Sequence, residues 1–292
     1  MNNFHSFVHG TPINRQQNAL TLDDVAHFAP SAMAIAAHES RSARYTYIPT
    51  VDIIRGMMAE GFQPFRASQS TSRIEGRAAF TKHMIRFRHA GAQLQNVGDI
   101  IPEVVLINSH DGSSAYKLIA GLFRLVCSNG LMVSDAEIAA VTVRHQGNIL
   151  ENVIEGSYSL VKDSQKAIGT AKAWSALQLT DGEQKVFGEA AHTLRFADAE
   201  GKVDTPITAA QLLAPRRSAD AGNDLWKTFN RVQENTLKGG LHARAQWVNG
   251  ERRNAVTTRE VKGIDQDVKL NRALWTLTER MAELKGGSAS AA

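Results

Sequence analysis

The spacing of apolar residues changes once along the chain, near Gly147, and this change limits the folds open to it. Before Gly147, several short stretches alternate between apolar and polar residues, which is the two-residue period of β-strands. After it, apolar residues from Ile149 to Trp174 recur at helical spacing and form one face of a helix predicted to reach residue 177. We therefore expect an α+β protein, in which a curved antiparallel sheet with hairpins is backed by a long helix.

The sheet is predicted to lie between residues 45 and 145. A short strand at 45–48 and a helix at 51–60, closed by Gly61, precede a strand at 81–89. One face of that strand carries His83, Ile85 and Phe87, and we expect it to face the core. The other face carries Lys82, Met84, Arg86 and Arg88, and we expect it to be exposed and cationic. A hairpin is indicated next. It consists of a β-branched strand at 103–108, a polar turn at 109–113 and a second apolar segment at 115–126. This last segment is predicted to be a strand or a strand that leads into a helix. A turn at Asn129-Gly130 and an alternating stretch at 140–145 follow.

The C-terminal part is predicted to be mainly helical. Thr180 and Glu183 have capping-box spacing ahead of a helix at 184–196, and Asn223 is expected to cap a helix at 224–238. Residues 265–285 also have helical spacing. We divide the chain into a flexible N-terminal arm (1–20), an α+β core (21–178), a helical region with a basic hairpin (179–285) and a tail (286–292) whose composition predicts disorder.

The composition indicates a soluble protein of a reducing compartment. The 292 residues, 43% of them hydrophobic, can bury one large core or two modest ones. The single cysteine, Cys127, permits no intrachain disulfide, and the N-terminal residues lack the pattern of a signal peptide. No apolar run approaches the roughly 20 residues that span a bilayer. We therefore expect a cytoplasmic protein that makes no membrane contact.

Several separated motifs carry a resemblance to a known family. They are residues 45–61 (YTYIPTVDIIRGMMAEG), 108–114 (NSHDGSS), 124–130 (RLVCSNG) and 259–277 (REVKGIDQDVKLNRALWTL). In this order they resemble the DUF932 family, a domain of unknown function of phages and plasmids, over about residues 20–284, although Gly130 stands where the family usually has threonine. The resemblance implies a role in replication, recombination or defence evasion of a mobile element.

Catalytic chemistry is not predicted. Ser109, His110 and Asp111 are the residue types of a hydrolase triad, but neighbouring side chains on an extended segment point apart, so a polar turn is favoured. Cys127 lies in an apolar context typical of an inert buried thiol. Asp265 and Asp267 lie at the start of a predicted helix, where the helix dipole stabilises negative charge, so their presence does not require a metal or a catalytic role. The sequence has no metal-binding or phosphate-binding motif, so we expect no metal, no cofactor and no enzyme activity.

Positive charge is concentrated near the C-terminal end. Residues 237–262 have a net charge of +4, equal to the formal charge of the whole chain. Residues 249–254 are predicted to form the tip of a β-hairpin that projects Arg252 and Arg253, with Trp247 close by. The arginines could bind phosphates while Trp247 stacks on a base, as in proteins that bind single strands. In the alternative, the arginines are only solvated and Trp247 packs on the helices. The predicted nucleic-acid-binding residues are Lys82, Arg86, Arg88, Arg244, Trp247, Arg252, Arg253 and Arg259.

Two hypotheses of function remain open. The first is a nucleic-acid-binding protein of a mobile element that binds or anneals single-stranded DNA in recombination or replication, and assembles as a ring or filament of identical subunits. Its predicted architecture is similar to the core of ring-forming annealing proteins, which is an analogy of fold. The second is a non-enzymatic interaction protein that inhibits or redirects a host factor. The salt dependence of nucleic-acid binding distinguishes them.

Overall fold

The computed structural model describes residues 18–39, 47–74, 76–91, 100–124, 129–132, 140–143, 148–248 and 251–286. It divides the chain into an N-terminal unit, residues 1–165, and a C-terminal unit, residues 166–292. The boundary falls within a long helix, 13 residues before the predicted boundary at residue 178. Each unit is described by itself below. The predicted arm and tail lie almost entirely outside the described residues.

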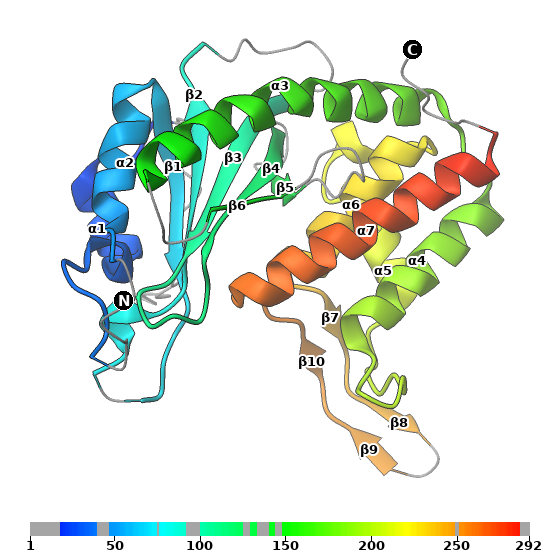
Figure 1. The fold of residues 1–292 in the computed structure, drawn as a ribbon. Coiled ribbons are helices and arrows are strands. Elements are labelled where there is room, and N and C mark those ends of the chain that lie inside the picture. Colours follow the sequence, from blue (N-terminus) through cyan, green and yellow to red (C-terminus); the bar gives the residue numbers. More distant parts are fainter. Residues whose placement is uncertain are drawn as a thin grey trace, which may run out of the picture. The chain divides into compact units, whose positions relative to one another are not determined.

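The N-terminal unit is built on an antiparallel sheet, as predicted (Figure 1). The strand order is β1-β2-β3-β4-β5, and β6 pairs with the other half of β4. The strands are β1 (Phe62–Gln69), β2 (His83–His89), β3 (Ile100–Asn108), β4 (Tyr116–Arg124), β5 (Asn129–Met132) and β6 (Val141–Val143). The helices are α1 (Leu22–Phe28), η1 (Pro30–Met33), α2 (Thr50–Ala59), η2 (Ala78–Phe80) and the first part of α3 (Ile149–Ala176).

The long helix α3 crosses over the strands in Figure 1, and its contacts identify the face that it covers. A Cβ atom at Gly156 would lie 3.0 Å from Leu118 and 3.2 Å from Val141, so glycine lets the helix approach β4 and β6 closely. The Ser157 hydroxyl lies 3.4 Å from the sulfur of Met57, which links α3 to α2. Helix α3 therefore packs on this face of the sheet, and the predicted long helix is confirmed.

Several local predictions for this unit are wrong. Tyr47 and Ile48 are not in a strand, while residues 45 and 46 lie outside the described residues. Asn129 and Gly130 belong to β5, where they pair with Arg124 and Phe123 instead of forming a turn. Strand β1 was not predicted, because its Pro64 and polar residues break the alternation, and Pro64 is tolerated at the edge of the sheet.

The C-terminal unit is mainly helical, as predicted. Its helices are the end of α3, α4 (Asp181–Phe196), α5 (Ala209–Leu213), η3 (Ser218–Asp220), α6 (Leu225–Lys238) and α7 (Ile264–Leu284). Trp174, Trp226, Phe229 and Trp275 form its aromatic core, with 4.6 Å between the ring centroids of Trp174 and Trp275. Burial of such large rings supplies much of the hydrophobic stabilisation.

The helix boundaries show how local sequence sets the start of each helix. The predicted capping box of Thr180 and Glu183 is confirmed, with Glu183 N–H donating to Thr180 Oγ1 at 3.3 Å. The next residue after Asn223, Asp224, caps α6 and accepts from Lys227 N–H at 2.8 Å, so the predicted cap is wrong by one position. Among the described residues, no helix combines the length and apolar character needed to cross a membrane.

Candidate nucleic-acid interface

A two-stranded ribbon leaves the helices of the C-terminal unit between α6 and α7 (Figure 1). Strand β7 (His242–Ala243) pairs with β10 (Val256–Thr257), and β8 (Gln246–Val248) pairs with β9 (Glu251–Arg253). Trp247 lies opposite Arg252 in this register. The hairpin predicted around residues 249–254 is therefore confirmed, and its strands extend to residues 242 and 257.

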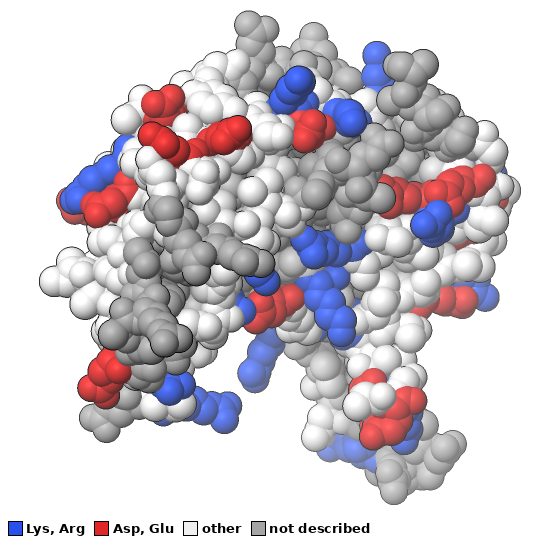
Figure 2. All heavy atoms as spheres, in the orientation of Figure 1, with Lys and Arg blue, Asp and Glu red and all other residues white. Residues whose placement is uncertain are grey.

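The ribbon carries exposed positive charge. Arg244, Arg252 and Arg259 are exposed, and their side chains make no ion pair within the described part of the chain. At the lower right of Figure 2, where Figure 1 places the ribbon, both basic and acidic side chains are visible at the surface. Trp247 and Arg253 are described only in their backbone. Whether the tryptophan stacks on a base therefore stays a prediction.

The root of the ribbon is held by a close approach of two backbone segments. Gly239 ends α6 with φ +66°, and a Cβ atom there would lie 2.5 Å from the carbonyl carbon of Arg259. Gly240 N–H donates to the carbonyl of Thr258 at 2.8 Å, and Thr258 N–H donates to the carbonyl of Leu241 at 2.8 Å. Only glycine fits at residue 239 without a shift of the backbone. The ribbon is therefore fixed to the helices at its base.

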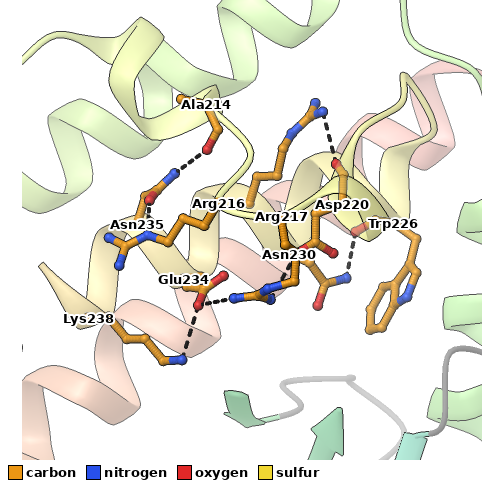
Figure 3. A network of polar contacts seen from close by, with 10 residues as sticks. Ala214, Arg216, Arg217, Asp220, Trp226, Asn230, Glu234, Asn235 and Lys238 are labelled. Atoms are coloured by element: carbon orange, nitrogen blue, oxygen red, sulfur yellow. Dashed lines mark hydrogen bonds and ion pairs between the residues drawn. The ribbon is translucent and has the colours of Figure 1, made fainter. Parts of the chain in front are cut away.

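Helix α6 is buried although it is rich in polar residues, and these residues bind the segment before it (Figure 3). Arg216 Nε donates to Asn235 Oδ1 at 2.6 Å, and its Nη2 donates to the carbonyl of Gly239. Glu234 forms ion pairs with Arg217 at 2.5 Å and with Lys238 at 3.0 Å. Lys238 therefore does not contribute the free charge that was counted for residues 237–262.

Arg195 of α4 binds two carbonyl groups near the same root. Its Nε donates to Thr236 at 3.1 Å and its Nη2 donates to Arg259 at 3.3 Å. Partial burial lowers its pKa. Arg195 and Arg216 thus satisfy carbonyls at the end of α6, which a helix cannot satisfy internally. Neither arginine is predicted from the sequence, because their partners lie between 19 and 64 residues away.

The cationic face predicted on the sheet is wrong for two of its three residues. Arg86 and Arg88 are buried, with side chains 2% and 9% exposed, and Phe87 between them is buried as well. Glu103 of β3 accepts from Arg86 Nε at 2.5 Å and from Arg88 Nε at 2.9 Å. Both faces of β2 are therefore covered, and the arginines neutralise a buried carboxylate. Lys82 lies outside this cluster and is partly exposed.

The buried cluster of Arg86, Arg88 and Glu103 is supported by two aromatic rings. The Arg88 guanidinium lies 3.7 Å from the ring centre of Phe123 and 4.1 Å from that of Phe65. Burial opposes ionisation of Glu103, but the two guanidinium groups together outweigh it and hold its pKa below the usual range. Burial also lowers the pKa of Arg88, which Glu103 partly offsets. The cluster is structural and offers no surface to a polyanion.

A second buried polar cluster joins two of the motifs that carry the family resemblance. Thr50 lies in the first motif, Asn108 and His110 lie in the second, and His83 comes from β2. The Thr50 Oγ1 atom is 2.9 Å from His83 Nε2, 3.0 Å from His110 Nε2 and 3.0 Å from Asn108 Nδ2. All four residues are fully buried. The cluster fixes α2 to β2 and to the turn between β3 and β4.

The contacts of His83 determine where the protons of this cluster lie. Burial lowers the pKa of His83 to about 3, with a further contribution from His110, so His83 is neutral. Its Nδ1 lies 3.2 Å from the carbonyl oxygen of Thr81, which can only accept, and 3.1 Å from the hydroxyl of Ser31, which can also accept, so we assign the proton to Nδ1. His83 Nε2 therefore accepts the Thr50 hydroxyl proton. Thr50 Oγ1 in turn accepts from Asn108 and from a proton on His110 Nε2.

Ser109, His110 and Asp111 make separate contacts in the structure. Ser109 Oγ accepts from Ser114 N–H at 2.8 Å, and Asp111 Oδ1 accepts from Ser113 N–H at 2.9 Å. His110 contacts Thr50, as described above. These are the contacts of a hairpin turn, as the adjacent positions predicted. Cys127 lies outside the described residues, and no group of three metal-ligating side chains occurs within the described part of the chain.

Comparisons with known proteins agree with the resemblance. Residues 37–275 match the profile of a family described as a domain of unknown function, DUF932. The UPF0380 protein YafZ of Escherichia coli (strain K12) is 43% identical over 267 residues, which cover 91% of this chain and 93% of that protein. The UPF0380 protein YfjQ of the same organism is 42% identical over 267 residues, with the same coverage. No solved structure matches.

Proposed function

The chain belongs to the DUF932 family, and we propose that it binds single-stranded nucleic acid through the ribbon between α6 and α7. One observation carries this proposal. Arg244, Arg252 and Arg259 are exposed along a ribbon that is fixed at its root, and no described carboxylate pairs with them. Such cations bind phosphates and release the counterions condensed on the nucleic acid.

The setting that we propose is replication or recombination of a mobile element, as a single-strand-binding or annealing protein. The resemblance to phage and plasmid proteins favours this setting. In such a role the ribbon holds the phosphates and leaves the base edges open for pairing. The chemistry needs neither a nucleophile nor a bound nucleotide, which agrees with the separate contacts of Ser109, His110 and Asp111.

The test is a fluorescence anisotropy titration of labelled single-stranded and double-stranded oligonucleotides across a salt series. We expect the wild-type protein to prefer the single strand. We expect Arg252→Ala/Arg253→Ala to lower the slope of log affinity against log salt by about 1.4, because each lost phosphate contact contributes about 0.7. Its folding should be unchanged, because exposed charges contribute little to stability.

The matched control removes the same charge elsewhere in the C-terminal unit. Lys172 of α3 and Lys185 of α4 are both exposed, so Lys172→Ala/Lys185→Ala should keep the wild-type salt slope. If Arg252→Ala/Arg253→Ala and Lys172→Ala/Lys185→Ala bound the oligonucleotide with equal affinity at low salt, the ribbon would not be part of the interface. In a separate variant, Trp247→Ala should weaken binding by about 1 to 3 kcal/mol if the indole stacks on a base. A loss of stability with unchanged binding would instead assign Trp247 to packing.

A further inference from the structure

The connection between β1 and β2, residues 70–82, exposes an isoleucine on a hydrogen-bonded turn. Ile74 is 58% exposed. Its N–H donates to Ser72 Oγ at 3.1 Å, the Ser72 hydroxyl donates to the Ile74 carbonyl at 3.3 Å, and Arg77 N–H donates to the same carbonyl at 3.3 Å. The backbone of Ile74 is therefore held on both sides, and its side chain is presented to solvent by a defined turn.

The same connection is tied to the sheet at its base. Ser70 N–H donates to the carbonyl of Lys82 at 2.7 Å, which continues the pairing of β1 with β2. Phe80 N–H donates to the carbonyl of Arg77 at 2.9 Å, and Thr81 Oγ1 donates to the carbonyl of Ala78 at 3.1 Å. The first of these bonds extends the sheet pairing by one residue, and the other two are local bonds that hold the end of the connection next to β2.

The charges of this connection are mainly positive. Residues 70–82 contain Arg73, Arg77 and Lys82 against one acidic residue, Glu75. Arg73 is exposed and Arg77 is partly exposed, and neither forms an ion pair within the described residues. The isoleucine is thus preceded directly by one arginine and followed three residues later by another.

We propose that Arg73, Ile74 and Arg77 form a second nucleic-acid contact, in which Ile74 inserts between neighbouring bases while Arg73 and Arg77 bind the phosphates beside them. Proteins that unstack bases use apolar wedges of this kind, isoleucine among them, together with cations on the backbone. This inference rests on the proposed function and adds an activity to it. The ribbon supplies affinity, and the insertion of Ile74 unstacks the bases, which prepares a strand for pairing with another.

The experiment uses the full chain and a single-stranded oligonucleotide of about 20 nucleotides, long enough for one binding site. The oligonucleotide contains 2-aminopurine between two adenines, and the fluorescence of this base rises when it is unstacked. Affinity is measured separately by anisotropy. The variants are Ile74→Ser, which removes the apolar side chain, and Ile74→Leu, which keeps one of similar size. Ile35→Ser is the matched control, because Ile35 is 88% exposed in the same unit.

We expect the wild-type protein, Ile74→Leu and Ile35→Ser to raise the fluorescence of 2-aminopurine. Ile74→Ser should bind within about twofold of the wild-type affinity and lose the rise, since exposed cations supply most of the affinity. A full rise with Ile74→Ser overturns the inference, as does a wild-type protein that binds without any rise. Both results leave the ribbon as the binding site.

Two further outcomes separate the alternatives. A wild-type protein that binds no oligonucleotide at low salt refutes the proposed function, and this inference with it. The variants are also tested on vesicles of anionic phospholipid, because an exposed isoleucine between arginines also suits a lipid surface. Vesicle binding that is lost in Ile74→Ser, with an unchanged fluorescence rise, assigns the connection to lipid and overturns the inference.

Discussion

Substitution of Glu103 by glutamine should destabilise the N-terminal unit strongly. Glu103 lies between Arg86 and Arg88, and the three side chains are 1%, 2% and 9% exposed. Glutamine keeps the shape of the side chain but removes its charge, so the two guanidinium groups lose the charge of Glu103 while they stay buried. Breaking a buried ion pair in this way costs about 3 to 5 kcal/mol. That is a large fraction of the roughly 5 to 15 kcal/mol that stabilises a typical domain.

The assay is urea unfolding followed with two probes, because the chain has two units that need not unfold together. All four tryptophans lie in the C-terminal unit, so tryptophan fluorescence reports on that unit alone. Far-UV circular dichroism also reports on the sheet of the N-terminal unit. We expect Glu103→Gln to lower the midpoint of the circular dichroism transition by at least about 1 M urea. The fluorescence transition of the C-terminal unit should keep its midpoint.

The control is Asp52→Asn, which removes a carboxylate from an exposed pair in the same unit. Asp52 lies 3.1 Å from Arg55, and the side chains are 53% and 61% exposed. Exposed pairs of this kind contribute less than about 1 kcal/mol. If Glu103→Gln and Asp52→Asn lowered the free energy of unfolding equally, the buried arginines would have to be stabilised without Glu103, and the reasoning would be refuted.

Two further predictions concern acid stability and the root of the ribbon. Because the pKa of His83 is about 3 in the folded protein and about 6.5 when unfolded, the stability that its neutral form supplies is complete above pH 6.5. It should fall by about 1.4 kcal/mol per pH unit between pH 6.5 and 3. The variant His83→Gln should therefore flatten a plot of unfolding free energy against pH. Gly239→Ala should reduce oligonucleotide affinity and thermal stability, because its Cβ would lie 2.5 Å from the backbone of Arg259. Gly240 has a similar φ of +78°, but a Cβ atom there would have no other atom within 4 Å. If Gly240→Ala lowered affinity and stability as much as Gly239→Ala, backbone strain and not the contact with Arg259 would be responsible.

The local features of the chain followed from the sequence because neighbouring residues determine them. Apolar residues at helical spacing predicted the helix that the structure forms at Ile149–Ala176. The capping box of Thr180 and Glu183 and the hairpin tip beside β8 and β9 also depend on residues within a few positions of one another. The same reasoning failed for β1, whose polar residues become strand residues only because β2 pairs with them.

The sequence by itself determined the α+β class, the long helix and the basic ribbon, because period, capping and turn chemistry are local properties. Only the tertiary structure decided which cations are free. Alternation placed Arg86 and Arg88 on a polar face, but Glu103 lies on the neighbouring strand and makes that face a buried ion cluster. Lys238 is likewise paired with Glu234 one turn away, whereas Arg252 remains exposed. The physical reason is that the free energy of a charge depends on its burial and its counter-charge, and both are set by segments that folding brings together.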